Sequence, residues 1–104
     1  MIKIVDGKRY NTKTAEAVAS YDRGLGYGNF RQYSETLYRT SKGNWFLAGE
    51  GGPASPYFED VGDNMRGAGS GIMVLTIEEA ICWLEEHDEI SALEEYFPDV
   101  IQDA

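Results

Sequence analysis

Residues 33–48, YSETLYRTSKGNWFLA, decide the fold. Side chains alternate in character over residues 33–40, which is typical of a strand with two different faces. Residues 41–44 are turn formers, and the apolar residues 45–48 supply a returning strand. The stretch therefore predicts a β-hairpin. Neither face of its first strand is wholly apolar, so we expect a sheet that is solvated on one side or open to a partner.

A second hairpin is predicted at the N-terminus. Asp6-Gly7 separates residues 2–5, IKIV, from residues 8–10, KRY. Asp-Gly between two such runs is a strong hairpin signal, because glycine tolerates positive φ. The apolar run at 72–75, IMVL, predicts a further strand, which we expect in the middle of the sheet.

Along the sequence, one helix is predicted before the hairpin of residues 33–48 and another after the strand of residues 72–75. Asn11 or Thr12, followed by apolar residues at 15, 18 and 19, favours a short amphipathic helix over about residues 13–21. Thr76 and Glu79 form a capping box, which predicts that a helix begins there. Its expected core stripe is Ile77, Ala80, Ile81 and Leu84, with Trp83 and His87 at one edge.

A second C-terminal helix is expected after Asp88, which is placed to cap it. This helix would carry Ile90, Leu93, Tyr96 and Phe97 and end at Pro98. Together these elements predict an α+β fold: an antiparallel sheet of about three to five strands with helices packed on one face. The 104 residues are expected to form a single domain, 1–104.

The charge of −9 is concentrated at the C-terminal end of the chain. Residues 77–104 contain ten Asp and Glu residues and no Lys or Arg, whereas residues 1–76 are nearly balanced. One interpretation is a solvated face that keeps the protein soluble. The other is a docking surface for a basic partner, because complementary charge raises association rates. In that case Glu85, Glu86, Glu94 and Glu95 are the candidate partner-binding residues.

Residues 49–71 hold seven of the twelve glycines, together with Pro53 and Pro56. A structureless loop of this length is uncommon in a small domain and is often functional. It is either a crossover pinned in the core by Tyr57 and Phe58, or a recognition loop. Met65 and Arg66 are expected to be exposed there and are further candidate contacts with a partner.

No catalytic motif emerges from the sequence, and no enzyme activity or cofactor is expected. Cys82 and His87 are five residues apart on one predicted helix, so their side chains diverge by about 140°. Acidic neighbours also oppose a thiolate, and Cys82 should be exposed or in an oligomer interface. The glycine clusters at 24–28 and 67–71 lack the strand-to-helix context of a phosphate loop.

Several partner classes are also disfavoured by composition. One cysteine and one histidine make a transition-metal site improbable. No apolar run approaches the roughly 20 residues of a membrane span. There is no signal-peptide segment, so a reducing cytoplasm is expected. Direct nucleic-acid binding is not expected, because it usually needs a basic surface.

Several motifs suggest a relationship to other proteins: GKRY at 7–10, ETLYRT at 35–40, GNWFL at 43–47, GEGG at 49–52 and LTIEEA at 75–80. In these motifs the chain resembles a family of small, mostly uncharacterised bacterial proteins that are often carried on prophages and mobile elements. Small acidic proteins of this origin include anti-CRISPR inhibitors, to which the chain is similar in size and charge.

The resemblance implies a binding protein that inhibits a host nucleic-acid-handling complex, such as a CRISPR effector. The expected partner is a basic surface of a host protein or ribonucleoprotein complex. A small-ligand binder or enzyme that uses residues 49–71 is the alternative from another functional class. A regulatory homodimer is a third hypothesis.

Overall fold

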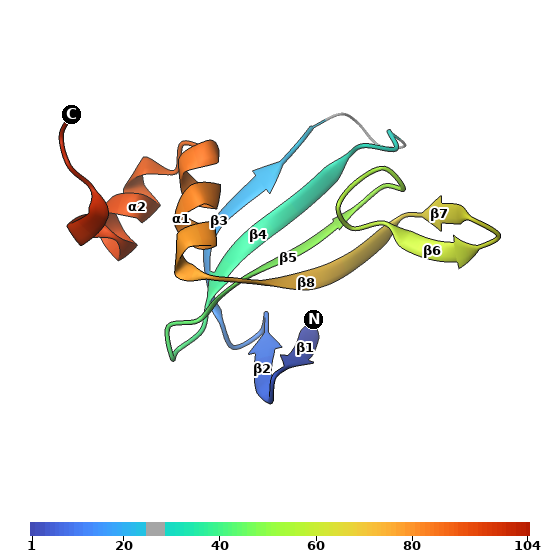
Figure 1. Ribbon diagram of the computed structural model, residues 1–104, viewed down its shortest axis with the longest axis horizontal. Coiled ribbons are helices and arrows are strands. Elements are labelled where there is room, and N and C mark those ends of the chain that lie inside the picture. The colour runs from blue at the N-terminus through green and yellow to red at the C-terminus, as the bar shows by residue number, and fades with distance from the viewer. Residues whose placement is uncertain (25–28) are drawn as a thin grey trace.

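The hairpin predicted over residues 33–48 is confirmed, and as β4 and β5 it forms the centre of the sheet. The computed structural model describes residues 1–24 and 29–104. Strands β4 (Tyr33–Arg39) and β5 (Trp45–Gly51) pair antiparallel, with Leu37 opposite Leu47. Strands β3 (Glu16–Asp22) and β8 (Gly69–Leu75) flank them, which gives the antiparallel order β3-β4-β5-β8 (Figure 1).

Two further hairpins and two helices complete the α+β fold. The first hairpin is β1 (Ile2–Val5) with β2 (Lys8–Asn11), and the second is β6 (Glu59–Gly62) with β7 (Met65–Gly67). Asp6 and Gly7 adopt the positive φ angles that the predicted turn needs. Helices α1 (Ile77–Glu86) and α2 (Ile90–Tyr96) are followed by the short 3-10 turn η1 (Pro98–Val100). Figure 1 places the helices and β6–β7 at opposite ends of the sheet.

Strand β5 is buried on both faces of the sheet. Its side chains alternate between the two faces, and each set packs in a different core cluster. Trp45 and Leu47 join the core cluster beneath the helices. Phe46 and Ala48 join a second cluster on the opposite face, against Tyr10 of the N-terminal hairpin. The helices therefore pack on one face of the sheet, as predicted, and the β1–β2 hairpin covers part of the other.

Helix α1 begins as the sequence predicts, with both hydrogen bonds of the capping box. Glu79 N donates to Thr76 Oγ1 at 3.1 Å, and Thr76 N donates to Glu79 Oε1 at 2.9 Å. The predicted stripe is only partly right, because Ile77 is 53% exposed whereas Trp83 is buried. Trp83 faces the sheet because its indole nitrogen finds an acceptor there, as described below.

The predicted helix over residues 13–21 is wrong, since this segment forms strand β3. The register with β4 shifts between Ala17 and Ala19, which marks a β-bulge. The bulge explains why Val18, Ala19 and Tyr21 all pack against the helix-side cluster, although a regular strand would alternate them. Their spacing imitated a helical stripe. Pairing with the open edge of β4 outweighed the weak local helical preference.

The strand at 72–75 is present, but its predicted place in the middle of the sheet is wrong. It belongs to β8, which pairs with β5 alone and forms one edge. Its central residues Met73 and Val74 are each 38% exposed. Lys3 Nζ donates to the carbonyl oxygen of Ile72 at 3.2 Å, so a charged side chain shields part of the edge.

The second helix forms, but Asp88 does not cap it. Asp88 has a φ of 53°, and Glu89 occupies the N-cap position without a side-chain hydrogen bond. Ile90 is exposed, and Ala92 is the buried residue of α2. The helix ends at Tyr96, before Pro98, as expected. In the part of the chain that the structure describes, neither helix is long and apolar enough to cross a membrane.

Residues 49–71 are not a structureless loop. Residues 49–51 end β5, residues 69–71 begin β8, and the hairpin β6–β7 stands between them. Tyr57 is buried, as one interpretation required, but Phe58 is 42% exposed and is not a core anchor. The glycines misled the prediction because Gly49, Gly51 and Gly69 lie in strands, where larger side chains would collide with residues 55–57 of the covering segment.

Candidate functional site

A buried carboxylate joins the sheet to the two elements that cover it. Glu35, in β4, is only 8% exposed. Tyr57 Oη donates to its Oε2 at 2.5 Å, and Trp83 Nε1 donates to its Oε1 at 2.7 Å. An ionised acceptor makes strong hydrogen bonds, and a buried carboxylate is costly without them. The three side chains therefore lock residues 52–58 and helix α1 to the same face of the sheet.

Residues 52–58 hold Tyr57 in place by folding back over strand β5. Ser55 Oγ donates to the Gly52 carbonyl oxygen at 2.7 Å and accepts from Tyr57 N at 3.2 Å. A Cβ atom at Gly49 would lie 2.6 Å from Tyr57 Cε2 and 2.7 Å from the Ser34 carbonyl oxygen. Glycine is therefore needed at position 49 so that the tyrosine ring can reach Glu35.

Aromatic rings surround this carboxylate. Tyr33 lies 6.5 Å from Tyr57 and 5.8 Å from Tyr21, measured between ring centroids. His87 lies 4.1 Å from Tyr21, and its Nδ1 is 2.7 Å from the Trp83 carbonyl oxygen. Because that carbonyl only accepts, Nδ1 carries the proton. Both oxygens of Glu35 accept hydrogen bonds, from Tyr57 and Trp83, so this cluster holds together the elements that pack on this face of the sheet.

The cluster predicts a loss of stability at alkaline pH. Burial raises the pKa of Tyr57 above its ordinary value of 10.0, and the hydrogen bond to Glu35 raises it further. The folded protein therefore keeps a proton that the unfolded chain loses above about pH 10, so the free energy of unfolding falls as pH rises there. We expect a steeper fall for the wild-type protein than for Tyr57→Phe in urea titrations between about pH 9 and 12. Equal slopes would contradict this assignment.

The four predicted acidic contact residues lie at the helical end of the molecule. Glu85 and Glu86 are the last residues of α1, and Glu94 and Glu95 lie near the end of α2. All four side chains are exposed. Their carboxylates are therefore open to water and to any docking surface. We call the exposed acids Glu85, Glu86, Glu94 and Glu95 the acidic face.

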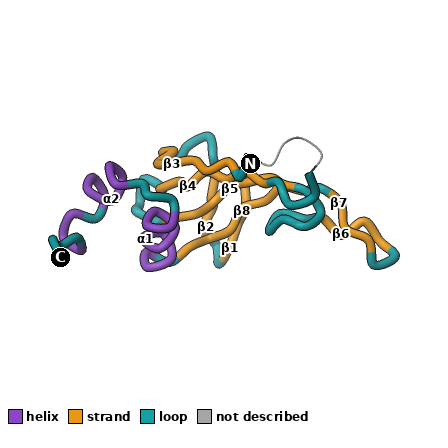
Figure 2. Tube along the Cα trace, turned by 90° about the horizontal axis from the view of Figure 1, so that it is seen from above, coloured by secondary structure: helices purple, strands orange, loops and turns teal. Residues whose placement is uncertain are grey.

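Met65 and Arg66 lie at the other end, in the protruding hairpin of residues 59–67, which we call the finger. Both are exposed, as predicted. The guanidinium carbon of Arg66 lies 4.1 Å from the centroid of the Phe58 ring, a cation–π distance. Figures 1 and 2 show the finger and the helices at opposite ends, and the longest dimension of the molecule is 49 Å. The structure thus does not bring the two predicted contact regions together.

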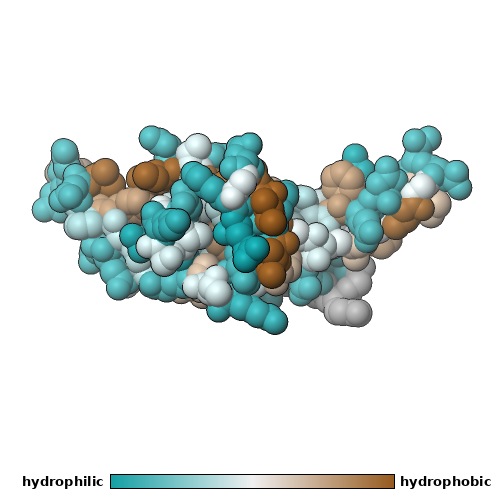
Figure 3. Space-filling view, turned by 90° about the horizontal axis from the view of Figure 1, so that it is seen from below, coloured by the Kyte–Doolittle hydropathy of each residue, from teal (hydrophilic) through white to brown (hydrophobic). Residues whose placement is uncertain are grey.

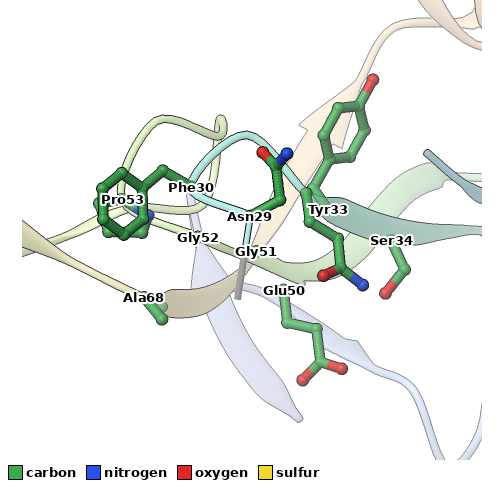
Figure 4. Close-up of a pocket in the computed structure, with 11 residues that line it drawn as sticks. Asn29, Phe30, Tyr33, Ser34, Glu50, Gly51, Gly52, Pro53 and Ala68 are labelled. Carbon is green, nitrogen blue, oxygen red and sulfur yellow. The ribbon is translucent and has the colours of Figure 1, made fainter. Parts of the chain in front are cut away.

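An open pocket of about 480 Å³ lies where the finger leaves the sheet. In Figure 4, Phe30 and Pro53 lie on one side of this pocket, and Ser34 and Glu50 on the other. Gly51 and Gly52 lie between them. We call it the end pocket. It uses residues 50–53 and 68–69 of the segment that the sequence marked as functional.

The motifs that the sequence disfavoured for chemistry gain no support. Cys82 is exposed, as expected. Among residues 1–24 and 29–104, no group of three or more His, Cys, Asp or Glu side chains is placed to hold a metal ion. Residues 67–71 lie mainly in strands β7 and β8. Residues 25–28 of the other glycine cluster lie outside the described residues.

Sequence reasoning missed Glu35 and its partners. The signal was available in outline, because Glu35 shares a strand face with Leu37, and an acid on an apolar face needs a buried partner. The partners come from residues 57 and 83, which are 22 and 48 positions away along the chain. No local spacing rule connects them.

Comparison of the chain with protein-family models, curated proteins and solved structures finds no match. Function must therefore be argued from the surfaces of the molecule itself.

Proposed function

We propose that this chain is a small acidic binding protein of phage or mobile-element origin that inhibits a host nucleic-acid-handling complex. It does so by occupying a basic surface that the complex needs, and a CRISPR effector is the leading candidate target. It works by stoichiometric binding and not as an enzyme. The observation that carries the proposal is the acidic face.

The exposure of these acids supports a docking role. Residues 77–104 contribute ten acids and no Lys or Arg, so no basic residue within this segment offsets their charge. Glu85 and Glu86 sit on α1, which packs on the sheet through Ala80, Trp83 and Leu84. Glu94 and Glu95 sit on α2, which joins the same core cluster through Ala92. A rigid array of one sign resembles a nucleic-acid backbone in charge and steers basic partners toward it.

Neutralising the acidic face tests this proposal. In the variant Glu85→Gln, Glu86→Gln, Glu94→Gln and Glu95→Gln, we expect target affinity to fall by about ten- to one-hundredfold, at a few tenths to 1 kcal/mol for each surface charge. The target is first captured from a host lysate at low salt and identified by mass spectrometry. Its affinity is then measured by titration calorimetry, and inhibition by restored plaque formation of a phage under CRISPR attack.

A matched control removes the same charge elsewhere. Asp6→Asn and Asp22→Asn change two exposed acids outside the helices and the finger, and they are compared with the double variant Glu94→Gln and Glu95→Gln, which removes the same charge from the acidic face. Asparagine tolerates the positive φ of residue 6. We expect this control to keep its affinity within about threefold, since screening weakens distant charges. Equal losses of affinity in both variants would show that net charge alone, and not the acidic face, causes the effect. A folded acidic-face variant with full inhibition would refute the proposal.

Met65 and Arg66 are proposed as a second contact. They lie in strand β7 of the finger, where Met65 is 62% exposed, and flexible methionine suits an adaptable contact. Because the finger and the acidic face lie at opposite ends of the molecule, one partner that touches both must present an extended surface.

A small-ligand binder is the second candidate, favoured by the end pocket alone. Its volume of about 480 Å³ falls within the usual range of ligand sites. The homodimer hypothesis rests on the open edge of β8, and sedimentation at several concentrations tests it.

A further inference from the structure

We propose that the end pocket binds the arginine side chain of a basic protein partner. This inference deepens the proposed function. The acidic face attracts any basic residue of the partner, whereas the end pocket would bind arginine specifically. The inference depends on the proposed function for the partner, but the pocket chemistry is independent of the acidic face.

The charge of the pocket favours a cation. Among the described residues that line it, Glu50 is the only one with a carboxyl group, and none is Lys or Arg. Glu50 is exposed, and its cross-strand partners Ser34 and Ser70 carry short side chains that leave the carboxylate uncovered. An arginine guanidinium can donate two parallel hydrogen bonds to such a group, which an ammonium cannot.

An uncovered aromatic ring favours a planar cation. Phe30 is 70% exposed, although it stands at the rim of a pocket with Pro53 nearby. Guanidinium groups stack on aromatic faces. The same molecule already makes this contact elsewhere, between Arg66 and Phe58. The stem of an arginine side chain would meet Pro53 and Ala68, and Gln32 and Ser34 offer further oxygen acceptors.

The hollow is built into the backbone. Gly52 N donates to the Gln32 carbonyl oxygen at 2.8 Å, and Ala54 N donates to the Phe30 carbonyl oxygen at 2.7 Å. These bonds fix residues 30–32 against residues 52–54. A Cβ atom at Gly52 would lie only 2.6 Å from the Phe30 carbonyl oxygen. Glycine therefore allows the two segments to approach and leaves the floor open, so the pocket is formed before a ligand arrives.

Peptide titration tests the inference without knowledge of the partner. The probe is the capped peptide acetyl-Gly-Arg-Gly-amide, added to the ¹⁵N-labelled full chain. We expect shifted amide signals in residues 29–34, 50–52 and 68–69. The matched citrulline peptide, which is neutral but of the same shape, should bind at least tenfold more weakly. Equal binding of both peptides, or shifts confined to residues 77–104, would overturn the proposal.

Variants locate the contact. Glu50→Gln should weaken binding of the arginine peptide about tenfold, and Phe30→Ala about threefold, in line with an exposed cation–π contact. Both positions are exposed, so the fold is expected to survive. Asp6→Asn and Phe58→Ala are the matched charge and ring controls and should stay within twofold, since both positions are exposed and lie outside the end pocket and the acidic face. Unchanged affinity in folded Glu50→Gln would refute the proposal.

Two further outcomes separate this inference from the others. Free L-arginine that binds more than tenfold tighter than the peptide would point to a metabolite and overturn the partner assignment. If the acidic-face variant still inhibits, and the peptide titration separately shows arginine binding in the end pocket, the proposed function loses its acidic face and the pocket assignment stands.

Discussion

Replacing Glu35 by alanine is expected to lower the free energy of unfolding by about 3–5 kcal/mol, the usual cost of breaking a buried charged network. The substitution leaves Tyr57 Oη and Trp83 Nε1 without their acceptor inside the protein. It also frees residues 52–58 and α1 from the sheet. Since the free energy of unfolding of a native protein is only about 5–15 kcal/mol in total, a large part of the stability would be lost. Urea denaturation followed by circular dichroism measures the change.

Two variants make this test specific. Glu35→Gln keeps one oxygen acceptor, so we expect its free energy of unfolding to lie between those of the wild-type and Glu35→Ala proteins. Glu50→Ala removes an exposed acid from the neighbouring strand, where surface changes usually stay within about 0.5 kcal/mol. A Glu35→Ala protein no less stable than Glu50→Ala would show that the network contributes nothing.

Replacing Phe46 by alanine is expected to cost about 3–5 kcal/mol as well, through a cavity and not through an unpaired group. Phe46 is fully buried. Its ring stacks on Tyr38 at 5.1 Å between centroids and meets the edge of Tyr10 at 5.6 Å. It is therefore the main apolar link between the sheet and the N-terminal hairpin. The same denaturation experiment measures the loss.

Hydrogen exchange identifies where the Phe46→Ala protein loosens. Amides of β1 and β2 should exchange faster relative to those of α1, because the cavity opens on the hairpin side of the sheet. Val74→Ala is the control, since Val74 pairs with Phe46 on the same face but is partly exposed. A cost for Phe46→Ala no greater than that for Val74→Ala would contradict the assigned packing.

Much of the local structure could be predicted because its causes are local. The Asp6-Gly7 turn needs positive φ, and both residues adopt it. The capping box at Thr76 and Glu79 forms within four residues. The hairpin around residues 41–44 follows from a turn between two strand-forming runs. In each case the interacting groups lie within a few positions of one another.

Prediction failed where distant partners decided the outcome. Residues 16–22 became a strand because β4 offered an unpaired edge, and a bulge let their spacing imitate a helix. The apolar run of 72–75 was expected in the middle of the sheet, but it belongs to β8, which forms one edge of the sheet in the described structure. Gly49 and Gly51 were expected in a loop, yet they lie in β5 beneath Tyr57 and Ser55.

The candidate functional surfaces also divide into those that local sequence determines and those that depend on distant residues. The sequence by itself determined the α+β class, the charge of residues 77–104 and the exposure of Met65 and Arg66, because composition and short-range periodicity govern them. Only the tertiary structure decided that Glu35 is buried between Tyr57 and Trp83, and that residues 29–30, 32–34, 50–53 and 68–69 line the end pocket. Those groups meet only after the chain has folded, because packing and hydrogen bonding act through space and not along the sequence.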